Sequence, residues 1–238
     1  MNGIEGTAIS WSYESSRKAL IFEGIGALPD LLAPLETSEL VEGIGHDEWI
    51  RIAPWGKHLD DIQTIEGEGI TAIGPGMFAW MGNLKTVLMP KVQIVGNGAF
   101  YLCKKLERVY IPEVVFIGNG AFEHCESLCS TDEGVRKLFF RELRHISAYA
   151  FHGCKNMTTV SVTRKSRITS EGKEIQSSGS KLEFVGEYAF AECEKLSNFH
   201  DGGQASKAFK DKTAFYKTRI SAKTKAFEEE AVEGDDQG

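Results

Sequence analysis

Apolar and polar positions follow one motif that recurs five times along the chain. Each copy has a Phe preceded by Ala or Met, with a Cys or Met three residues after the Phe and a Leu or Met six residues after it. The copies are centred on Phe78, Phe100, Phe122, Phe151 and Phe190, so their spacings are 22, 22, 29 and 39 residues. The last two spacings fit the same period with about 7 and about 17 residues inserted. Such a repeat predicts a solenoid whose units stack and bury a shared core.

The apolar spacing changes within each unit. In residues 99–106 the apolar positions fall at i, i+1, i+4 and i+7, which predicts a short helix, and Asn97 could cap its start. Residues 108–111 alternate between polar and apolar, which predicts a strand. A second extended piece, 114–117, follows a Pro turn and ends at Gly118. We therefore expect each unit to contain a helical turn, a strand, a turn and a second short extended piece.

The regions on either side of the repeats have a different pattern. Near the start, two apolar runs at 7–13 and 19–22 predict a strand pair that covers the open end of the first unit. Near the end the motif fades, and the last residues are acidic and poor in apolar side chains, which predicts disorder. The expected organisation is an N-terminal cap at 1–61, repeats at 62–200 with insertions near 129–135 and 164–181, a degenerate C-terminal cap at 201–227 and a disordered tail at 228–238.

The run from Val114 to Leu128 resembles the BspA-like leucine-rich repeat, and the segments 9–13, 20–30 and 53–55 resemble the leading part of that family. The resemblance covers about residues 9 to 200. It implies an α/β fold: a right-handed leucine-rich-repeat solenoid of short strands and short helical turns, with a β-rich N-terminal cap. It also implies a cell-surface or secreted protein of a host-associated microbe that takes part in adhesion or partner binding. It brings no catalytic residues with it.

Composition narrows the possible partners. The chain has 238 residues, a net charge of −7 and 42% hydrophobic residues, which suits one elongated domain with a continuous core. The acidic balance argues against nucleic acid as the main partner. The apolar runs are too short for membrane insertion. The first residues, Met1–Gly6, lack the basic and apolar regions of a signal peptide, so we expect none in this chain.

The five cysteines do not predict a chemical site. Cys103, Cys125, Cys154 and Cys193 occupy the same repeat position, so we expect them to be reduced and buried as small apolar side chains. Cys129 lies outside this register and is expected to be the most reactive thiol. The histidines occupy different repeat positions, and the sequence has no nucleophile elbow, zinc-binding spacing or phosphate loop. We therefore expect no catalytic, cofactor or metal site, and a protein that is not an enzyme.

Stacking would align outward-facing side chains of the main strand. We expect the partner surface there, because exposed Tyr and Arg are enriched at interface hot spots; ordinary packing on a strand face is the alternative. Thr86, Thr159 and Ser161 would surround this patch. The expected partner-binding residues are Leu88, Arg108, Tyr110, Lys137 and Phe139.

A second row of side chains would lie on the other extended piece. Ile94, Phe116, His145 and Phe184 would form an exposed apolar stripe there, unless the inserted segments cover it. The sequence thus favours a non-enzymatic protein-binding or adhesion module that presents its strand face to a host or bacterial macromolecule. The alternative is a structural spacer or intracellular scaffold without a ligand site of its own.

Overall fold

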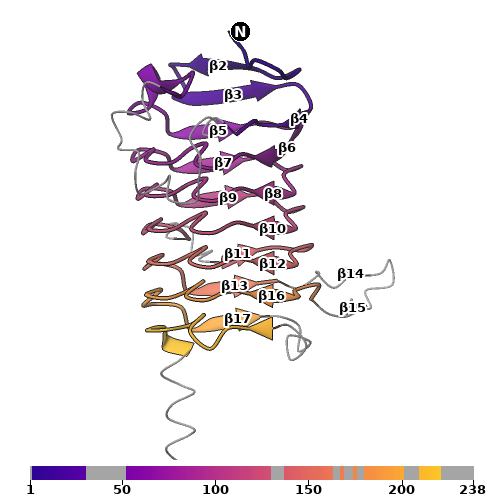
Figure 1. Cartoon of the computed structure of the whole chain (residues 1–238), viewed down its shortest axis with the longest axis vertical. Helices are drawn as coiled ribbons and strands as arrows, with labels where there is room; N and C mark the ends of the chain where they lie inside the picture. The colour runs from indigo at the N-terminus through magenta and orange to yellow at the C-terminus, as the bar shows by residue number, and fades with distance from the viewer. Residues whose placement is uncertain are drawn as a thin grey trace, which may run out of the picture.

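The computed structural model describes residues 2–30, 52–129, 137–162, 167–168, 174–175, 180–200 and 209–220. These residues form an elongated stack with the N-terminus at one end (Figure 1). Several predicted features lie outside the described residues: positions 31–51 of the N-terminal cap, 130–135 of the first insertion, much of the second insertion and the tail at 228–238.

The predicted N-terminal strand pair is present. Strand β2 (Ser10–Glu14) pairs antiparallel with β3 (Ala19–Glu23), and β1 (Asn2–Gly3) pairs with β2. Strand β3 then pairs parallel with β5 (Thr64–Glu66), the first strand of the repeats. The hairpin thereby extends the repeat sheet by antiparallel strands. A short 3-10 helix, η1 (Gly56–His58), follows the buried Trp55, which packs against Phe22 and Phe78.

One side of the stack carries the main strand of each unit, and its pairing is divided. A six-stranded sheet in the order β1-β2-β3-β5-β7-β9 ends at β9, and a separate three-stranded sheet, β11-β13-β17, follows it. In the part of the chain that the structure describes, no pairing joins β9 to β11. We call this the divided side. Its further strands are β7 (Thr86–Leu88), β9 (Arg108–Tyr110), β11 (Lys137–Phe139), β13 (Thr159–Ser161) and β17 (Asn198–His200).

The second extended piece of each unit forms one continuous sheet of seven strands. Its repeat strands are parallel, and each pairs with the equivalent strand of the next unit. In Figure 1 this continuous sheet runs down the right of the stack, beside the divided side. Its strands are β4 (Gly26–Ala27), β6 (Ile70–Ile73), β8 (Ile94–Val95), β10 (Phe116–Ile117), β12 (His145–Ile146), β16 (Phe184–Val185) and β18 (Phe209–Lys210). Outside both sides, β14 (Arg167–Ile168) and β15 (Glu174–Ile175) of the second insertion pair antiparallel.

The predicted short helix of the repeat is wrong, because consecutive turns take its place. In residues 97–105 the backbone is left-handed at Gly98 (φ +59°) and again at Leu102 (φ +59°), which interrupts a right-handed helix. Asn97 does not cap a helix either. Its side-chain Oδ1 accepts a hydrogen bond from the backbone N–H of Asn119 at 2.9 Å, which ties one turn to the equivalent turn of the next unit.

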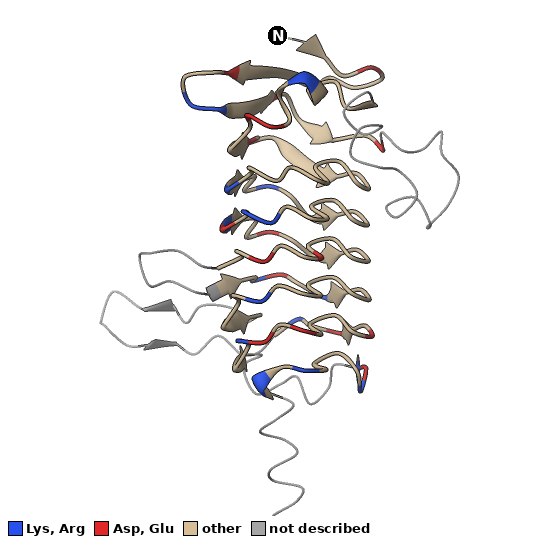
Figure 2. Cartoon of the chain, turned by 90° about the vertical axis from the view of Figure 1, so that its left-hand side faces the viewer, with Lys and Arg blue, Asp and Glu red and all other residues tan. Residues whose placement is uncertain are grey.

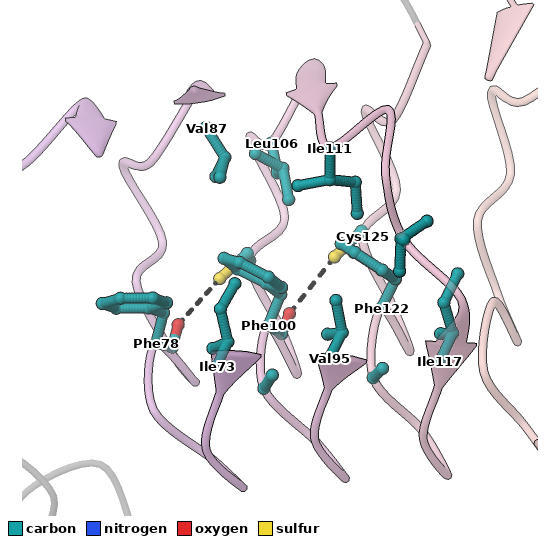
Figure 3. Packing of buried hydrophobic residues seen from close by; sticks show 14 of the residues in the cluster. Ile73, Phe78, Val87, Val95, Phe100, Leu106, Ile111, Ile117, Phe122 and Cys125 are labelled. Carbon is teal, nitrogen blue, oxygen red and sulfur yellow. Dashed lines mark hydrogen bonds between the residues drawn. The ribbon is translucent and has the colours of Figure 1, made fainter. Parts of the chain in front are cut away.

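The core is a column of stacked aromatic rings. The rings of Phe100 and Phe122 lie 5.1 Å apart and nearly parallel, and Phe122 stacks on Phe151 at 5.2 Å in the same way. Beside this column, the thiol of each repeat cysteine donates to the carbonyl of the Phe one unit earlier: Cys103 to Phe78 at 3.0 Å and Cys125 to Phe100 at 3.2 Å (Figure 3). The predicted burial of the four repeat cysteines is confirmed.

The column continues past the last predicted repeat. Strand β18 pairs with β16, Ala214 is fully buried, and the ring of Phe215 stacks on Phe190 at 5.4 Å. Residues 209–220 of the predicted C-terminal cap therefore occupy the place of one more unit.

Candidate partner-binding surfaces

Four side chains of the continuous sheet form one row. Strand pairing places Ile94 opposite Phe116, Phe116 opposite His145, and His145 opposite Phe184. We call this row the stripe. It forms because the side chains that follow in each strand, such as Val95 and Ile117, point into the core. The predicted alignment of the row is confirmed.

The stripe is partly exposed and its rings are stacked. Ile94 is 49% exposed and Phe116 is 36% exposed. The Phe116 and His145 rings lie 5.0 Å apart, and those of His145 and Phe184 lie 4.5 Å apart. Burial lowers the pKa of His145 below its usual value, although nearby Glu183 acts in the opposite direction. Burial thus favours the neutral imidazole, which keeps charge out of the stripe.

Charged pairs border the stripe. Arg144 and Glu183, which precede the stripe residues of their units, form an ion pair at 3.1 Å. At the corner towards the divided side, Lys91 pairs with Glu113 at 2.7 Å. In the view of Figure 2, acidic and basic residues are interspersed along the described stack. An apolar row with polar neighbours is the usual anatomy of a protein interface.

A hollow lies at the corner between the divided side and the continuous sheet. It has a volume of about 680 Å³ and joins Tyr110, at the end of the six-stranded sheet, to Val115, which precedes the stripe residue Phe116. Its lining combines prolines, one aromatic ring and four charged side chains: Pro90, Lys91, Gln93, Tyr110, Pro112, Glu113, Val115, Arg141 and Glu142.

The predicted strand-face residues are only partly brought together. Leu88 and Tyr110 are direct neighbours across β7 and β9, and they are 40% and 56% exposed. Arg108 is exposed beside them. Phe139 is half-buried, with the guanidinium of Arg141 5.8 Å from its ring centre. The Lys137 side chain lies outside the described residues.

The division of the sheet limits the predicted patch. Because β9 and β11 belong to different sheets, strand pairing does not place Phe139 beside Tyr110. Two of the expected polar neighbours are also buried rather than exposed: Ser161 is 1% exposed and Thr86 is 8% exposed. Both pack into the stack instead of facing solvent. The patch as a binding site stays a prediction.

The repeats match a known family model. The model describes the BspA type leucine rich repeat region, and it matches residues 58–172 and 135–233, with six copies. The chain belongs to this family. The resemblance of residues 114–128 is thereby confirmed, and the matched range reaches beyond the last predicted repeat.

A solved structure of another leucine-rich repeat protein supports a solenoid fold for this BspA-type repeat protein. A leucine-rich repeat protein of T. pallidum superimposes with a TM-score of 0.50 at 15% identity, over 94% of this chain and 95% of that one. A leucine-rich repeat protein of Bacteroides ovatus gives 0.41 at 14% identity, over 88% and 67% of the two chains. A leucine rich cell surface protein of Faecalibacterium prausnitzii gives 0.39 at 16% identity, over 84% and 54%. No curated protein matches by sequence.

The cysteines of this BspA-type protein offer no accessible nucleophile among the described residues. Cys129 is 3% exposed and burial raises the pKa of its thiol to about 12, so it is not an accessible nucleophile, although it is the least buried of the five cysteines. That it is the most reactive of them stays a prediction. The backbone N–H of Cys129 donates to the carbonyl of Glu107 at 3.0 Å, so the backbone at Cys129 is still hydrogen-bonded to the preceding unit. No described helix is both long and apolar enough to cross a membrane.

The turns form a third surface that the sequence did not reveal. We call it the turn edge: the segments around each repeat Phe, with left-handed residues two positions before and two after it. The signal was present, since glycines fill the earlier position in three units. In the later units Tyr149 and Tyr188 take that position and stack at 5.3 Å. Neighbouring rings make contact along this edge, through Trp80, Tyr101, His124, His152, Tyr149, Tyr188 and Tyr216.

Proposed function

We propose that this chain is a non-enzymatic module that binds a protein partner through the stripe on its continuous sheet. Repeats of this family are typical of protein-interaction or adhesion modules, and leucine-rich-repeat proteins are generally scaffolds rather than enzymes. The observation that carries the proposal is the stripe itself: four side chains from successive units in strand register, two of them large, apolar and exposed. Soluble proteins rarely leave a contiguous apolar row uncovered without a binding role.

The chemistry of the stripe indicates the kind of partner. A protein segment with apolar side chains would cover Ile94 and Phe116, and its polar groups would face the ion pairs of Arg144 with Glu183 and Lys91 with Glu113. On the resemblance to the BspA-like family, we place this binding at the cell surface or outside the cell.

A matched pair of double variants tests which side binds. Ile94→Ser with Phe116→Ser changes the continuous sheet, and Leu88→Ser with Tyr110→Ser changes the divided side in the same two consecutive units. Immobilised wild-type protein would capture partners from surface extracts, and affinities would then be measured with the purified partner. Loss of central aromatic and aliphatic contacts weakens binding by about 2–4 kcal/mol, or roughly 30- to 1,000-fold. We expect this loss for the first double variant and near-normal affinity for the second.

The other outcomes decide between the alternatives. If only the Leu88 and Tyr110 variant loses affinity, the strand face predicted from sequence is the partner surface and the stripe is not. If the wild-type chain captures no partner that it binds in purified form, the structural spacer or scaffold is the better description. Circular dichroism of each variant must match the wild type, since a misfolded variant would lose binding trivially.

A further inference from the structure

The turn edge brings two histidines and a glutamate from neighbouring units together. Glu123 and His124 directly follow the core residue Phe122, and His152 follows the core residue Phe151 of the next unit. The backbone N–H of His124 donates to the carbonyl of His152 at 2.8 Å, so the two turns are held in register. The left-handed conformation at His124 (φ +58°) ends its turn. The backbone that carries the three side chains is thus held in place by the buried Phe residues next to it.

The potential ligand atoms of these side chains converge. One oxygen of Glu123, Oε1, lies 3.0 Å from Nδ1 of His152 and 3.8 Å from Nε2 of His124, and one such atom from each residue lies within 4.8 Å of the others. A tetrahedral Zn²⁺ with ligand bonds of about 2.0–2.1 Å holds its ligand atoms about 3.4 Å apart. Small side-chain adjustments would therefore bring all three atoms to a common ion.

The surroundings suit an ion that exchanges with solvent. The three side chains are 20% to 34% exposed, so they are held by packing yet remain open on one side. Gly153 is required beside them, because a Cβ there would lie 2.5 Å from Nδ1 of His124. The open side leaves room for a water molecule as the fourth ligand.

A second carboxylate lies near His152. Oε2 of Glu192 lies 3.8 Å from Nε2 of His152, the ring nitrogen opposite the one beside Glu123. Lys217 pairs with Glu192 at 2.9 Å, and this contact is the main cause that lowers the pKa of Glu192. Histidines that bind a metal through one nitrogen usually donate the other N–H to a carboxylate, which fixes the ring. Glu192 lies beside that nitrogen, and a small rotation of its side chain would shorten the 3.8 Å separation to a hydrogen bond.

We propose that Glu123, His124 and His152 bind one divalent transition-metal ion, and that Zn²⁺ is the best match. Two imidazoles and one carboxylate are the donors that zinc and its neighbours prefer, whereas Mg²⁺ and Ca²⁺ favour oxygen alone. Glu192 is a positioning residue. The sequence led us to expect no metal site because the histidines occupy different repeat positions. That reasoning overlooked a contact between unlike positions of neighbouring units. His152, one residue after its repeat Phe, lies beside His124, two residues after the repeat Phe of the preceding unit.

Calorimetric titration of the full chain with ZnCl₂ near neutral pH tests the site. We expect one ion per chain, and visible absorption typical of low-coordinate cobalt when Co²⁺ replaces Zn²⁺. His124→Asn and His152→Gln each remove an imidazole, and Asn tolerates the left-handed backbone at position 124. Each of these variants should lose the one-to-one binding. Glu192→Gln should keep the stoichiometry but weaken the affinity by about 10- to 100-fold.

A third histidine provides the matched control. His145→Gln removes a partly exposed imidazole from the stripe, away from the cluster, and should bind Zn²⁺ like the wild type. Unchanged thermal unfolding of the metal-free variants would show that they fold. If the wild type binds no zinc, or if the variant that combines His124→Asn with His152→Gln binds it as well as the wild type, the proposal is wrong. The contact of Glu123 with His152 would then be an ordinary hydrogen bond.

Discussion

The divided side and the continuous sheet are built from the same units, yet only one of them is interrupted. The difference follows from where the extra residues enter. The first insertion enters after Leu128 and Cys129, directly before the main strand, and there the pairing of β9 with the next main strand is lost. The second insertion enters at the corner after β13, and both neighbouring pairings, β13 with β17 and β12 with β16, are kept.

This contrast shows which part of a solenoid tolerates added length. An insertion directly before a strand can shift the residues with which that strand pairs. An insertion in a corner loop lengthens the loop and leaves the strands on both sides in register. It also has a consequence for binding. On the continuous sheet a row of side chains runs through four units, while on the divided side the row of Leu88 and Tyr110 ends with its sheet.

The largest loss of stability is expected at Phe122, in the part of the core column between the two sheets of the divided side. The ring of Phe122 stacks on Phe100 on one side and on Phe151 on the other. It therefore connects the two halves of the stack, between which the described residues show no pairing of β9 with β11. Phe122→Ala should lower the free energy of unfolding by about 3–5 kcal/mol. Urea unfolding followed by circular dichroism measures this loss. A midpoint equal to that of the wild type would show that the column does not hold the halves together.

Much of this arrangement was predictable from the sequence. The spacing of the Phe, Cys and Leu positions gave the units, the core column and the burial of the repeat cysteines, because each depends on a local pattern repeated in every unit. The row of Ile94 and Phe116 also followed, since equal repeat positions align when the units stack.

The errors have physical causes as well. Residues spaced like Phe100, Cys103 and Leu106 share a helix face, but they also share the inner face of consecutive turns, and spacing alone does not distinguish the two. The left-handed backbone at Leu102 is incompatible with a continuous right-handed helix, so this segment forms turns. The division after β9 could not be predicted, because the path of an insertion depends on distant contacts. The cluster of His124 with His152 was missed because it joins different repeat positions.

A glycine of the continuous sheet offers the next test. Gly118 directly follows β10, and a Cβ there would lie 2.6 Å from Oδ1 of Asn97, 2.8 Å from its backbone nitrogen and 2.9 Å from the carbonyl carbon of Gly96. Gly118→Ala should therefore force neighbouring turns apart and cost about 1–3 kcal/mol of stability. Gly82→Ala is the control, because a Cβ there meets nothing within 4 Å. Equal unfolding midpoints for the two variants would mean that the continuous sheet is less tightly stacked than the structure shows.

The thiol of Cys129 gives a pH-dependent effect, which is smaller than the preceding ones for each pH unit. Burial raises the pKa of Cys129 to about 12, whereas an unfolded thiol titrates near 8.5. The folded chain then keeps a proton that the unfolded chain loses. The stability from this group is complete below about pH 8.5 and falls between that pH and about 12, by about 1.4 kcal/mol per pH unit.

Comparison of the wild type with Cys129→Ala isolates this contribution. The slope of unfolding free energy against pH, measured between about pH 9 and 11, should be less negative in the variant by about 1.4 kcal/mol per pH unit. Other groups that titrate in this range affect both proteins alike. Parallel slopes would indicate that Cys129 is accessible to solvent, and rapid labelling of the native thiol would show the same.

The smallest effect concerns the surface rows themselves. Phe116 stacks on His145 in the continuous sheet, whereas Tyr110 lies at the end of the divided sheet with its side chain 56% exposed. Stacked aromatic pairs contribute about 0.5–1.5 kcal/mol beyond the area they bury. Phe116→Ala should therefore cost about 1 kcal/mol, and a double-mutant cycle with His145→Ala should recover most of it as coupling. Tyr110→Ala, an ordinary surface change, should stay within about 0.5 kcal/mol of the wild type. Tyr110→Ala could instead lower the free energy of unfolding as much as Phe116→Ala does. Side chains on the divided side would then be held as firmly as those of the stripe, and the stacking of the stripe would no longer favour the continuous sheet as the binding surface.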